Sequence, residues 1–196
     1  MVTTNDGKVL LFGLTISIVH AIHLDNYVCR QGLMDVNIQN LSTNKRMKIK
    51  CILRYIKKLA VYKDNLAVLC NDRICIYKFT DEESAKLPKF IIKWDSECNL
   101  ILVTSFHFVI CSENRVLLYT QANKSVLERE WSFDSSIKYI KVIGGAVKRE
   151  TLVAGLRNGE IYMVYIDNQF PVLIYTHDVP IRSLDISSSR KKVNLS

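Results

Sequence analysis

The feature that most constrains this chain is a hairpin pattern that recurs along it, in which a short polar turn separates two apolar runs. In the clearest copy, 151–166, the runs LVAGL and IYMVYI flank the turn Arg157-Asn158-Gly159-Glu160. Asn-Gly in this position favours a β-hairpin with a type I′ turn, which needs positive φ at both central residues. The other copies are LAVLCNDRICIYKF (66–79), FVICSENRVLLYT (108–120) and NDGKVLLFGL (5–14). An isolated hairpin is marginally stable in water, so each copy needs a neighbour to pack against.

The spacing of the copies indicates which architecture supplies those neighbours. The second apolar run opens at Val9, Ile74, Val116 and Ile161, at successive intervals of 65, 42 and 45 residues. A period of about 40 to 45 residues in an all-strand chain is typical of a β-propeller, in which each repeat is a four-stranded blade and adjoining blades cover one another. We therefore expect an all-β chain that forms a partial WD40-like β-propeller of roughly three blades plus edge strands.

The segments between the copies fit the remaining strands of the blades. Strands are expected within 56–64, 90–105, 137–150, 170–178 and 181–187. The long first interval also contains MDVNIQNL (34–41) and RMKIKC (46–51), which we interpret as an extra hairpin. RMKIKC alternates apolar and basic residues, which is the period of a half-buried strand.

A closed propeller of roughly six to eight blades at this period needs more than the 196 residues of this chain. We therefore expect an incomplete fragment of a longer protein, with exposed sheet edges and apolar blade faces. The run VLLFGLTISIV (9–19) is too short to span a bilayer and lacks a small-residue cleavage site, so we interpret it as two blade strands. Without a targeting or membrane-spanning segment, a soluble intracellular protein is expected.

The chain is basic, with a net charge of +8, and seven of the 14 residues from Lys45 to Lys58 are Lys or Arg. Because these charges alternate with apolar residues, we expect them on the solvated face of a strand. The alternative function is a basic propeller module that binds nucleic acid or an acidic surface. That function would depend on Lys48, Lys50, Lys57 and Lys58.

Cysteine and histidine residues do not form a recognisable metal site. Cysteines are found at positions 29, 51, 70, 75, 98 and 111, and Cys70 and Cys75 are separated by four residues across a hairpin turn. A disulfide between them is conceivable, but we expect buried, reduced thiols of an intracellular protein. His20 and His23 are three residues apart, which in a strand places them on opposite faces. His107, in the apolar segment SFHFVI, is expected to be a hydrogen-bonded core residue.

Catalytic motifs are missing from the sequence. VIGGAVKR (142–149) has two glycines and two cations, but strand residues follow it where a phosphate-binding loop needs a helix, so we expect a loop between strands. Trp94-Asp95 is the dipeptide of WD repeats but precedes a strand, so we give it no weight. We predict no catalytic, cofactor-binding or metal-binding residues, no cofactor, and a protein that is not an enzyme. A hydrolytic propeller would instead need acidic groups beside His107 or His177 in a pocket.

Several long segments resemble one family. EREWSFDSSIKYIKVIGG (128–145), LVAGLRNGEIYMVYIDNQFPV (152–172) and IRSLDISSSRKK (181–192) are similar to the intraflagellar transport protein 122 family, the WD-repeat subunits of intraflagellar transport complex A. Weaker similarity is found in 6–14, 57–68, 97–103 and the strand pair at 34–51. The similarity covers nearly the whole chain in one register and is far more specific than a WD motif. The terminal KKVNLS departs from the family pattern, which continues as an apolar strand.

The resemblance implies a role and a domain organisation. Members of this family have two N-terminal propellers followed by a helical solenoid, so residues 1–52 would hold the last blade strands of the first propeller and a junction hairpin. Residues 53–196 would then hold the first blades of an incomplete second propeller. The resemblance implies a non-catalytic scaffold of complex A in retrograde ciliary transport, cilium assembly and ciliary entry of membrane proteins. The implied partners are other complex A subunits and ciliary cargo or its adaptors, at the cilium and the ciliary base.

Overall fold

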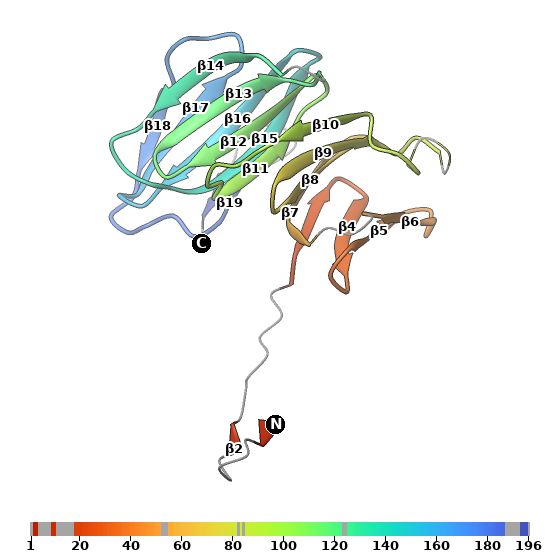
Figure 1. Ribbon diagram of the computed structural model, residues 1–196. Coiled ribbons are helices and arrows are strands. Elements are labelled where there is room, and N and C mark those ends of the chain that lie inside the picture. Colours follow the sequence, from red (N-terminus) through yellow and green to blue (C-terminus); the bar gives the residue numbers. More distant parts are fainter. Residues whose placement is uncertain are drawn as a thin grey trace.

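The computed structural model describes residues 2–3, 9–10, 18–51, 55–81, 83, 85–122, 125–186 and 193–195, and the regular elements among them are all β-strands. Four sheets of four antiparallel strands follow one another along the chain (Figure 1). The first two sheets consist of β3 (His20–His23), β4 (Asn26–Gln31), β5 (Asp35–Asn40) and β6 (Arg46–Lys50), and of β7 (Ile56–Tyr62), β8 (Asn65–Cys70), β9 (Arg73–Lys78) and β10 (Phe90–Lys93). The next two consist of β11 (Leu100–Val103), β12 (His107–Ser112), β13 (Arg115–Thr120) and β14 (Leu127–Ser132), and of β15 (Ile137–Ala146), β16 (Arg149–Leu156), β17 (Glu160–Tyr165) and β18 (Val172–Thr176). The shorter sheets pair β1 (Val2–Thr3) with β2 (Val9–Leu10), and β19 (Leu184–Ile186) with β20 (Val193–Leu195).

The four large sheets are arranged as the blades of a β-propeller. Within each sheet the strands pair in chain order, and the first strands of successive sheets lie against one another: β3 against β7, β7 against β11, and β11 against β15. Strand β19 continues this row beside β15. The first strands therefore line the axis, and the fourth strands β6, β10, β14 and β18 form the outer rim. The all-β class and the propeller architecture are confirmed.

The sequence predicted about three blades plus edge strands, and the described residues form four blades. The hairpin at 34–51, interpreted as a linker, is the outer half of the first blade, and β3 and β4 complete that blade. The third strands of the blades begin at residues 35, 73, 115 and 160, a regular spacing that the 65-residue interval from Val9 concealed. The turn between β3 and β4, at Leu24-Asp25, has Leu24 rather than Gly at its positive φ of 51°, so it lacks the glycine that marks the turn at 157–160.

The hairpin at 151–166 forms as predicted, but its turn is not of type I′. Among residues 157–160, only Gly159 has a positive φ, +89°, and its amide donates to the carbonyl of Leu156 over 3.2 Å. This bond, with a left-handed residue at its end, belongs to the longer hairpin loops that combine a type I turn with a glycine. A Cβ atom on Gly159 would lie 1.8 Å from the carbonyl oxygen of His177. The backbone that follows β18 therefore packs directly against this turn.

The loop predicted for VIGGAVKR (142–149) is mostly strand. Strand β15 continues to Ala146 and pairs with β16 on both sides of a bulge between Val142 and Gly144. The turn itself is Val147-Lys148. Glycine in a strand accommodates such a bulge, which explains why the Gly-Gly pair does not end the strand.

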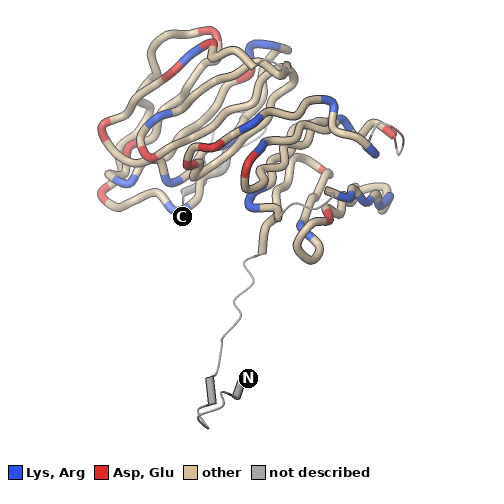
Figure 2. Tube along the Cα trace, viewed as in Figure 1, with Lys and Arg blue, Asp and Glu red and all other residues tan. Residues whose placement is uncertain are grey.

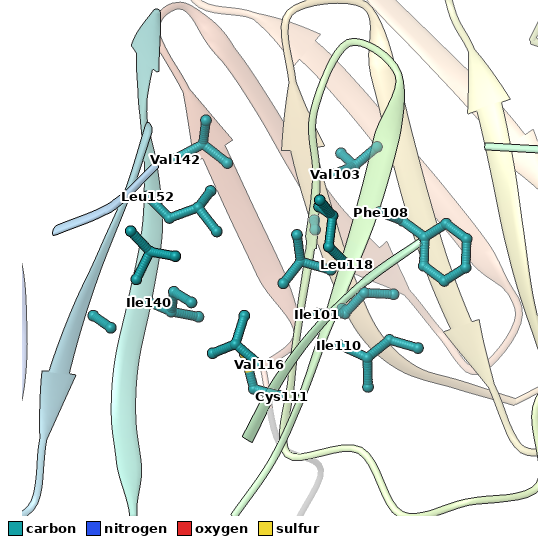
Figure 3. Packing of buried hydrophobic residues seen from close by; sticks show 14 of the residues in the cluster. Ile101, Val103, Phe108, Ile110, Cys111, Val116, Leu118, Ile140, Val142 and Leu152 are labelled. Carbon is teal, nitrogen blue, oxygen red and sulfur yellow. The ribbon is translucent and has the colours of Figure 1, made fainter. Parts of the chain in front are cut away.

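The core lies between the blades. Neighbouring side chains of β8 enter two different clusters: Ala67 and Leu69 face the third blade, whereas Leu66 and Val68 face the first blade. The apolar run NLAVLC is therefore buried on both faces, as expected for a blade covered by two neighbours. Figure 3 shows another part of the cluster that holds Ala67 and Leu69, where the third blade meets the fourth around residues such as Val116 and Leu152.

Several predictions concern residues outside the described ranges. The turn of the first hairpin copy (5–8), the apolar segment 11–17 and the polar segment 187–192 lie there. Of that first copy, the structure describes the pairing of Val2 with Leu10 and of Thr3 with Val9. The division of the chain after residue 52 between two propellers stays a prediction.

Candidate functional site

The first strands of the four blades enclose a cavity of about 310 Å³ at the propeller axis. Consecutive residues of β3, β7, β11 and β15 line it. Apolar residues such as Val61 and Ile101 form much of the wall, and His23 and Lys141 contribute polar groups. This cavity is the part of the central channel that four blades define.

His23 joins the first blade to the second at this cavity. Its Nδ1 accepts a hydrogen bond from the amide of Lys63 over 3.1 Å, and its ring centroid lies 4.5 Å from that of Tyr62. Burial lowers the pKa of His23, and the positive charges of Lys141 and Lys63 lower it further. The folded protein therefore favours the neutral imidazole, which can accept the bond from Lys63.

His107, predicted to be a hydrogen-bonded core residue, is buried and only partly bonded. Its Nε2 lies 3.0 Å from Oε2 of Glu128, while its Nδ1 has no partner. The pair ties β12 to the outer strand β14. An acidic group thus does lie beside His107, as a hydrolytic site would need, but neither residue lines any of the five cavities described for the chain. The arrangement is a polar contact within one blade.

The other histidines lie apart. The ring centroid of His20 is 6.1 Å from that of Tyr27, and Nδ1 of His177 accepts from the amide of Val179 over 3.2 Å. In the part of the chain that the structure describes, no group of three or more His, Cys, Asp or Glu side chains is placed to hold a metal ion. His20 and His23 contact different aromatic rings, and both line the cavity at the propeller axis.

Glu150 makes a buried contact between two blades that could not be predicted from the sequence. It is fully buried; its Oε1 accepts a hydrogen bond from the amide of Ser105 over 3.1 Å, and its Oε2 has no partner. Ser105 lies between β11 and β12, so the carboxylate connects the fourth blade to a turn of the third. In the sequence Glu150 follows Lys148 and Arg149 and is indistinguishable from a solvated strand end.

All six cysteines are free thiols, as predicted. Cys51, Cys70, Cys75 and Cys111 are buried, and Cys29 and Cys98 are partly exposed. Burial raises the pKa of Cys51 and of Cys98, each to about 11. These two thiols are therefore protonated at neutral pH.

The basic stretch 45–58 is divided between two blades. Arg46, Lys48 and Lys50 lie on the exposed side of β6, at the outer rim of the first blade, where Lys48 pairs with Asp35 over 2.7 Å (Figure 2). Lys57 and Lys58 belong to β7, on the axis of the second blade. The predicted solvated face is confirmed for β6. The stretch is therefore not one continuous basic strand, which removes the main argument for a nucleic-acid site.

A comparison with protein families identifies this propeller. The model that describes the second β-propeller of intraflagellar transport protein 122 (IFT122) matches residues 20–195, which is most of the chain. The chain belongs to the IFT122 family. The match begins at His20 and so includes all four blades.

Whole-protein relatives agree with this IFT122 assignment. The IFT122 homologues of Mus musculus and Homo sapiens are each 37% identical over 198 residues and cover 98% of this chain. The homologue of Xenopus tropicalis is 39% identical over 192 residues and covers 96% of the chain. The chain spans 16% of the length of each of these relatives.

Solved structures confirm the propeller fold of this IFT122 family member. Kluyveromyces lactis Hsv2p superposes with a TM-score of 0.66 at 13% identity, covering 91% of this chain and 56% of that one. BBS1N, in a crystal structure with ARL6DN, gives a TM-score of 0.64 at 14% identity, covering 87% of this chain and 56% of that one. The β-propeller domain of Myceliophteria thermophila Cps50 (Swd1) gives a TM-score of 0.63 at 12% identity, covering 93% of this chain and 63% of that one. At these identities the likeness concerns the fold alone.

Other features bear on how an IFT122 propeller could contact a partner. The outer strand β18 is exposed at every residue, and four of its five residues are Val172, Leu173, Ile174 and Tyr175. Among the described residues, no helix is long and apolar enough to cross a membrane. The accessible features of this chain are thus its rim strands and the loops between strands.

Proposed function

We propose that this chain is a propeller segment of a non-catalytic scaffold in intraflagellar transport complex A. The single observation that carries the proposal is the 37% identity with IFT122 homologues over 98% of the chain. A scaffold acts by presenting fixed surfaces to several partners, so that modest contacts add through avidity. We infer that the partners are other subunits of the complex, and that its roles are retrograde transport, cilium assembly and ciliary entry of membrane proteins. Its location would be the cilium and the ciliary base.

The geometry supports a rigid, non-catalytic role. His107 and Glu128 are joined within a blade and outside the described cavities, and His23 is committed to a bond between blades. Buried contacts between blades, such as that of Glu150 with Ser105, fix each sheet against the next. Such a body holds its loops and rim strands in constant positions, which is what a scaffold requires. Ciliary cargo or its adaptors would bind to these same surfaces.

The test is a purification of the full-length tagged protein from ciliated cells of its own species, followed by identification of the co-purifying proteins. We expect the other subunits of complex A. As a matched control, Leu152→Asp places a charge in the core between the third and fourth blades and should remove these subunits by unfolding the propeller. Recovery of no complex A subunit by the intact full-length protein would overturn the proposal.

A second experiment addresses the cellular role. Cells that lack their own IFT122 homologue should regain cilia, and lose the accumulation of transport proteins at ciliary tips, when the full-length protein is supplied. Binding to complex A without such rescue would retain the scaffold role and contradict the proposed part in retrograde transport.

A further inference from the structure

Three cysteines meet at one cavity between the first and second blades. The cavity has a volume of about 250 Å³ and its lining includes Cys51, which follows β6, together with Cys70 on β8 and Cys75 on β9. Three cationic side chains, Lys50, Arg73 and Lys86, also line it. A water molecule occupies about 30 Å³ in the liquid, so a small peroxide fits into this space.

Two of the three thiols are placed to react with each other. Val68 lies directly opposite Cys75 in the β8–β9 ladder, so Cys70, two residues further along β8, is the diagonal neighbour of Cys75 on the same face. The last pair of that ladder is Leu69 with Ile74. In the β8–β9 ladder Cys70 therefore lies one position beyond the last pair, at the hairpin end, while on its other side it pairs with Ile56 of β7.

The surroundings give the two thiols different roles. A hydrogen bond from the Cys70 thiol is the largest cause that lowers the pKa of Cys75, and the charge of Arg73 acts in the same direction. The same bond raises the pKa of Cys70, as does burial. Cys51 is bound elsewhere, because its Sγ lies 3.7 Å from the hydroxyl oxygen of Tyr77. Of the two thiols, Cys75 is therefore the one that forms a thiolate more readily.

We propose that Cys70 and Cys75 form a reversible thiol–disulfide site whose oxidant is a hydroperoxide that enters this cavity. The Cys75 thiolate attacks one peroxide oxygen, the O–O bond breaks, and the leaving oxygen takes up a proton as water or an alcohol. Cys75 is then a sulfenic acid. The Cys70 sulfur displaces its hydroxyl group, which leaves as water with the Cys70 proton, and the S–S bond forms. Two thiols have been oxidised and one hydroperoxide reduced.

The position of the pair makes this disulfide easy to reduce again. Diagonal neighbours in a sheet have Cα atoms about 7–8 Å apart, beyond the roughly 4.4–6.8 Å of an unstrained disulfide. Closure therefore pulls the hairpin end inward and stores strain, and strained disulfides are the more readily reduced ones. Such a bond is a reversible, redox-sensitive cross-link within the second blade, at the cavity that this blade shares with the first, and not a permanent one.

The test uses the full-length protein, reduced and then treated with hydrogen peroxide, and does not depend on any variant. Free thiols are alkylated under denaturing conditions and the protein is digested with trypsin, which cleaves after Lys63, Arg73 and Lys78. We expect peptides 64–73 and 74–78 to be recovered as a disulfide-linked pair that dithiothreitol separates. Cys111 is fully buried and lines none of the described cavities, so peroxide should not oxidise it. It should therefore be recovered in the alkylated form. Failure to find the linked pair, or a link from Cys51 to Cys75 in its place, would overturn the proposal.

Variants separate the two roles. In Cys70→Ala the sulfenic acid on Cys75 has no resolving thiol, so labelling of peptide 74–78 by dimedone should increase. In Cys75→Ala both the link and the dimedone label should be lost. The matched control Cys111→Ala should keep the linked pair. Dimedone labelling of Cys70 in the Cys75→Ala variant would contradict the assignment of Cys75 as the nucleophile.

Discussion

At the scale of single residues, Gly159 has the least room for a side chain among the glycines that the structure describes. Its φ is +89°, and an added Cβ would lie 1.8 Å from the carbonyl oxygen of His177. Gly32 provides a matched comparison, because its φ is +65° and nothing lies within 4 Å of the added atom. A left-handed conformation costs a residue with a Cβ about 1–2 kcal/mol, and overpacking adds about 1–3 kcal/mol.

We therefore predict that Gly159→Ala lowers the free energy of unfolding by about 2–5 kcal/mol, whereas Gly32→Ala lowers it by about 1–2 kcal/mol. Urea unfolding of both variants beside the parent chain measures the two losses. Equal losses would show that the close approach of the segment after β18 to the turn does not constrain the fold.

His23 makes the stability of the propeller depend on pH. Burial, followed by the charges of Lys141 and Lys63, lowers its pKa from the ordinary 6.5. The unfolded chain takes up this proton at a higher pH than the folded chain does, so protons favour unfolding. The contribution of His23 is fully present above pH 6.5 and is lost as the pH falls through the lowered pKa of the folded state.

Denaturant unfolding measured from pH 8 to about pH 5 should show this loss for the parent chain. His23→Gln, which does not titrate, should flatten the profile, and Lys141→Met should flatten it in part because one source of the shift is gone. If His23→Gln kept the full pH dependence, another group would be responsible.

At the scale of elements, the outer strands of the blades differ in how they are protected. Strand β6 carries Arg46, Lys48 and Lys50, and charged residues at a sheet edge prevent pairing with another chain. Strand β14 carries Glu128, Arg129 and Glu130. Strand β18, VLIYT, carries no charge and is exposed throughout. It is therefore the rim strand most prone to add a further strand.

We predict that Ile174→Lys reduces concentration-dependent association of this chain, because it places a charge in the middle of the unprotected edge. The converse variant Arg46→Val should increase association through β6. Ile174 is 39% exposed, so its replacement should change the free energy of unfolding little. Light scattering and sedimentation velocity over a concentration series measure the effect. Unchanged association of Ile174→Lys would mean that β18 is not the adhesive edge.

Strands with strong periodicity or clear turn residues could be predicted from sequence, and strands with neither could not. The alternation of Met47 and Ile49 with basic residues located β6, and the buried runs of β8, β12 and β16 were visible as apolar segments. The short strand β3, HAIH, has no such pattern, and its turn uses Leu24 at φ 51°. Because β3 was not predicted, the complete first blade was interpreted as a linking hairpin.

The hydrogen bonds between blades were even less predictable from the sequence. Glu150 meets Ser105 across 45 positions of sequence, and His23 meets Lys63 across 40. Such contacts depend on how one sheet is placed against the next, and no local pattern encodes this placement. The interval of 42 to 45 residues predicted that blades stack, but not which side chains connect them.

At the scale of the whole molecule, the stability of each blade depends on its neighbours, because the two main cores lie between sheets. Leu152 of the fourth blade is fully buried in the core that also contains Val116 and Leu118 of the third. Ile38 of the first blade is 4% exposed in the core that it shares with the second. In a stacked array, stability is approximately a sum of unit terms and nearest-neighbour interface terms, so damage spreads to the adjoining blade first.

We predict that Leu152→Ala and Ile38→Ala each cost about 2–5 kcal/mol, the range for such truncations in a core, and that the two losses appear in different places. Amide hydrogen exchange followed by mass spectrometry locates them. Leu152→Ala should speed exchange in β12 and β13 more than in β4 and β5, while Ile38→Ala should do the reverse. Because each variant is the control for the other, the prediction does not depend on the absolute size of either loss. A uniform increase of exchange along the chain in both variants would mean that the four blades unfold as a single cooperative unit instead of as coupled neighbours.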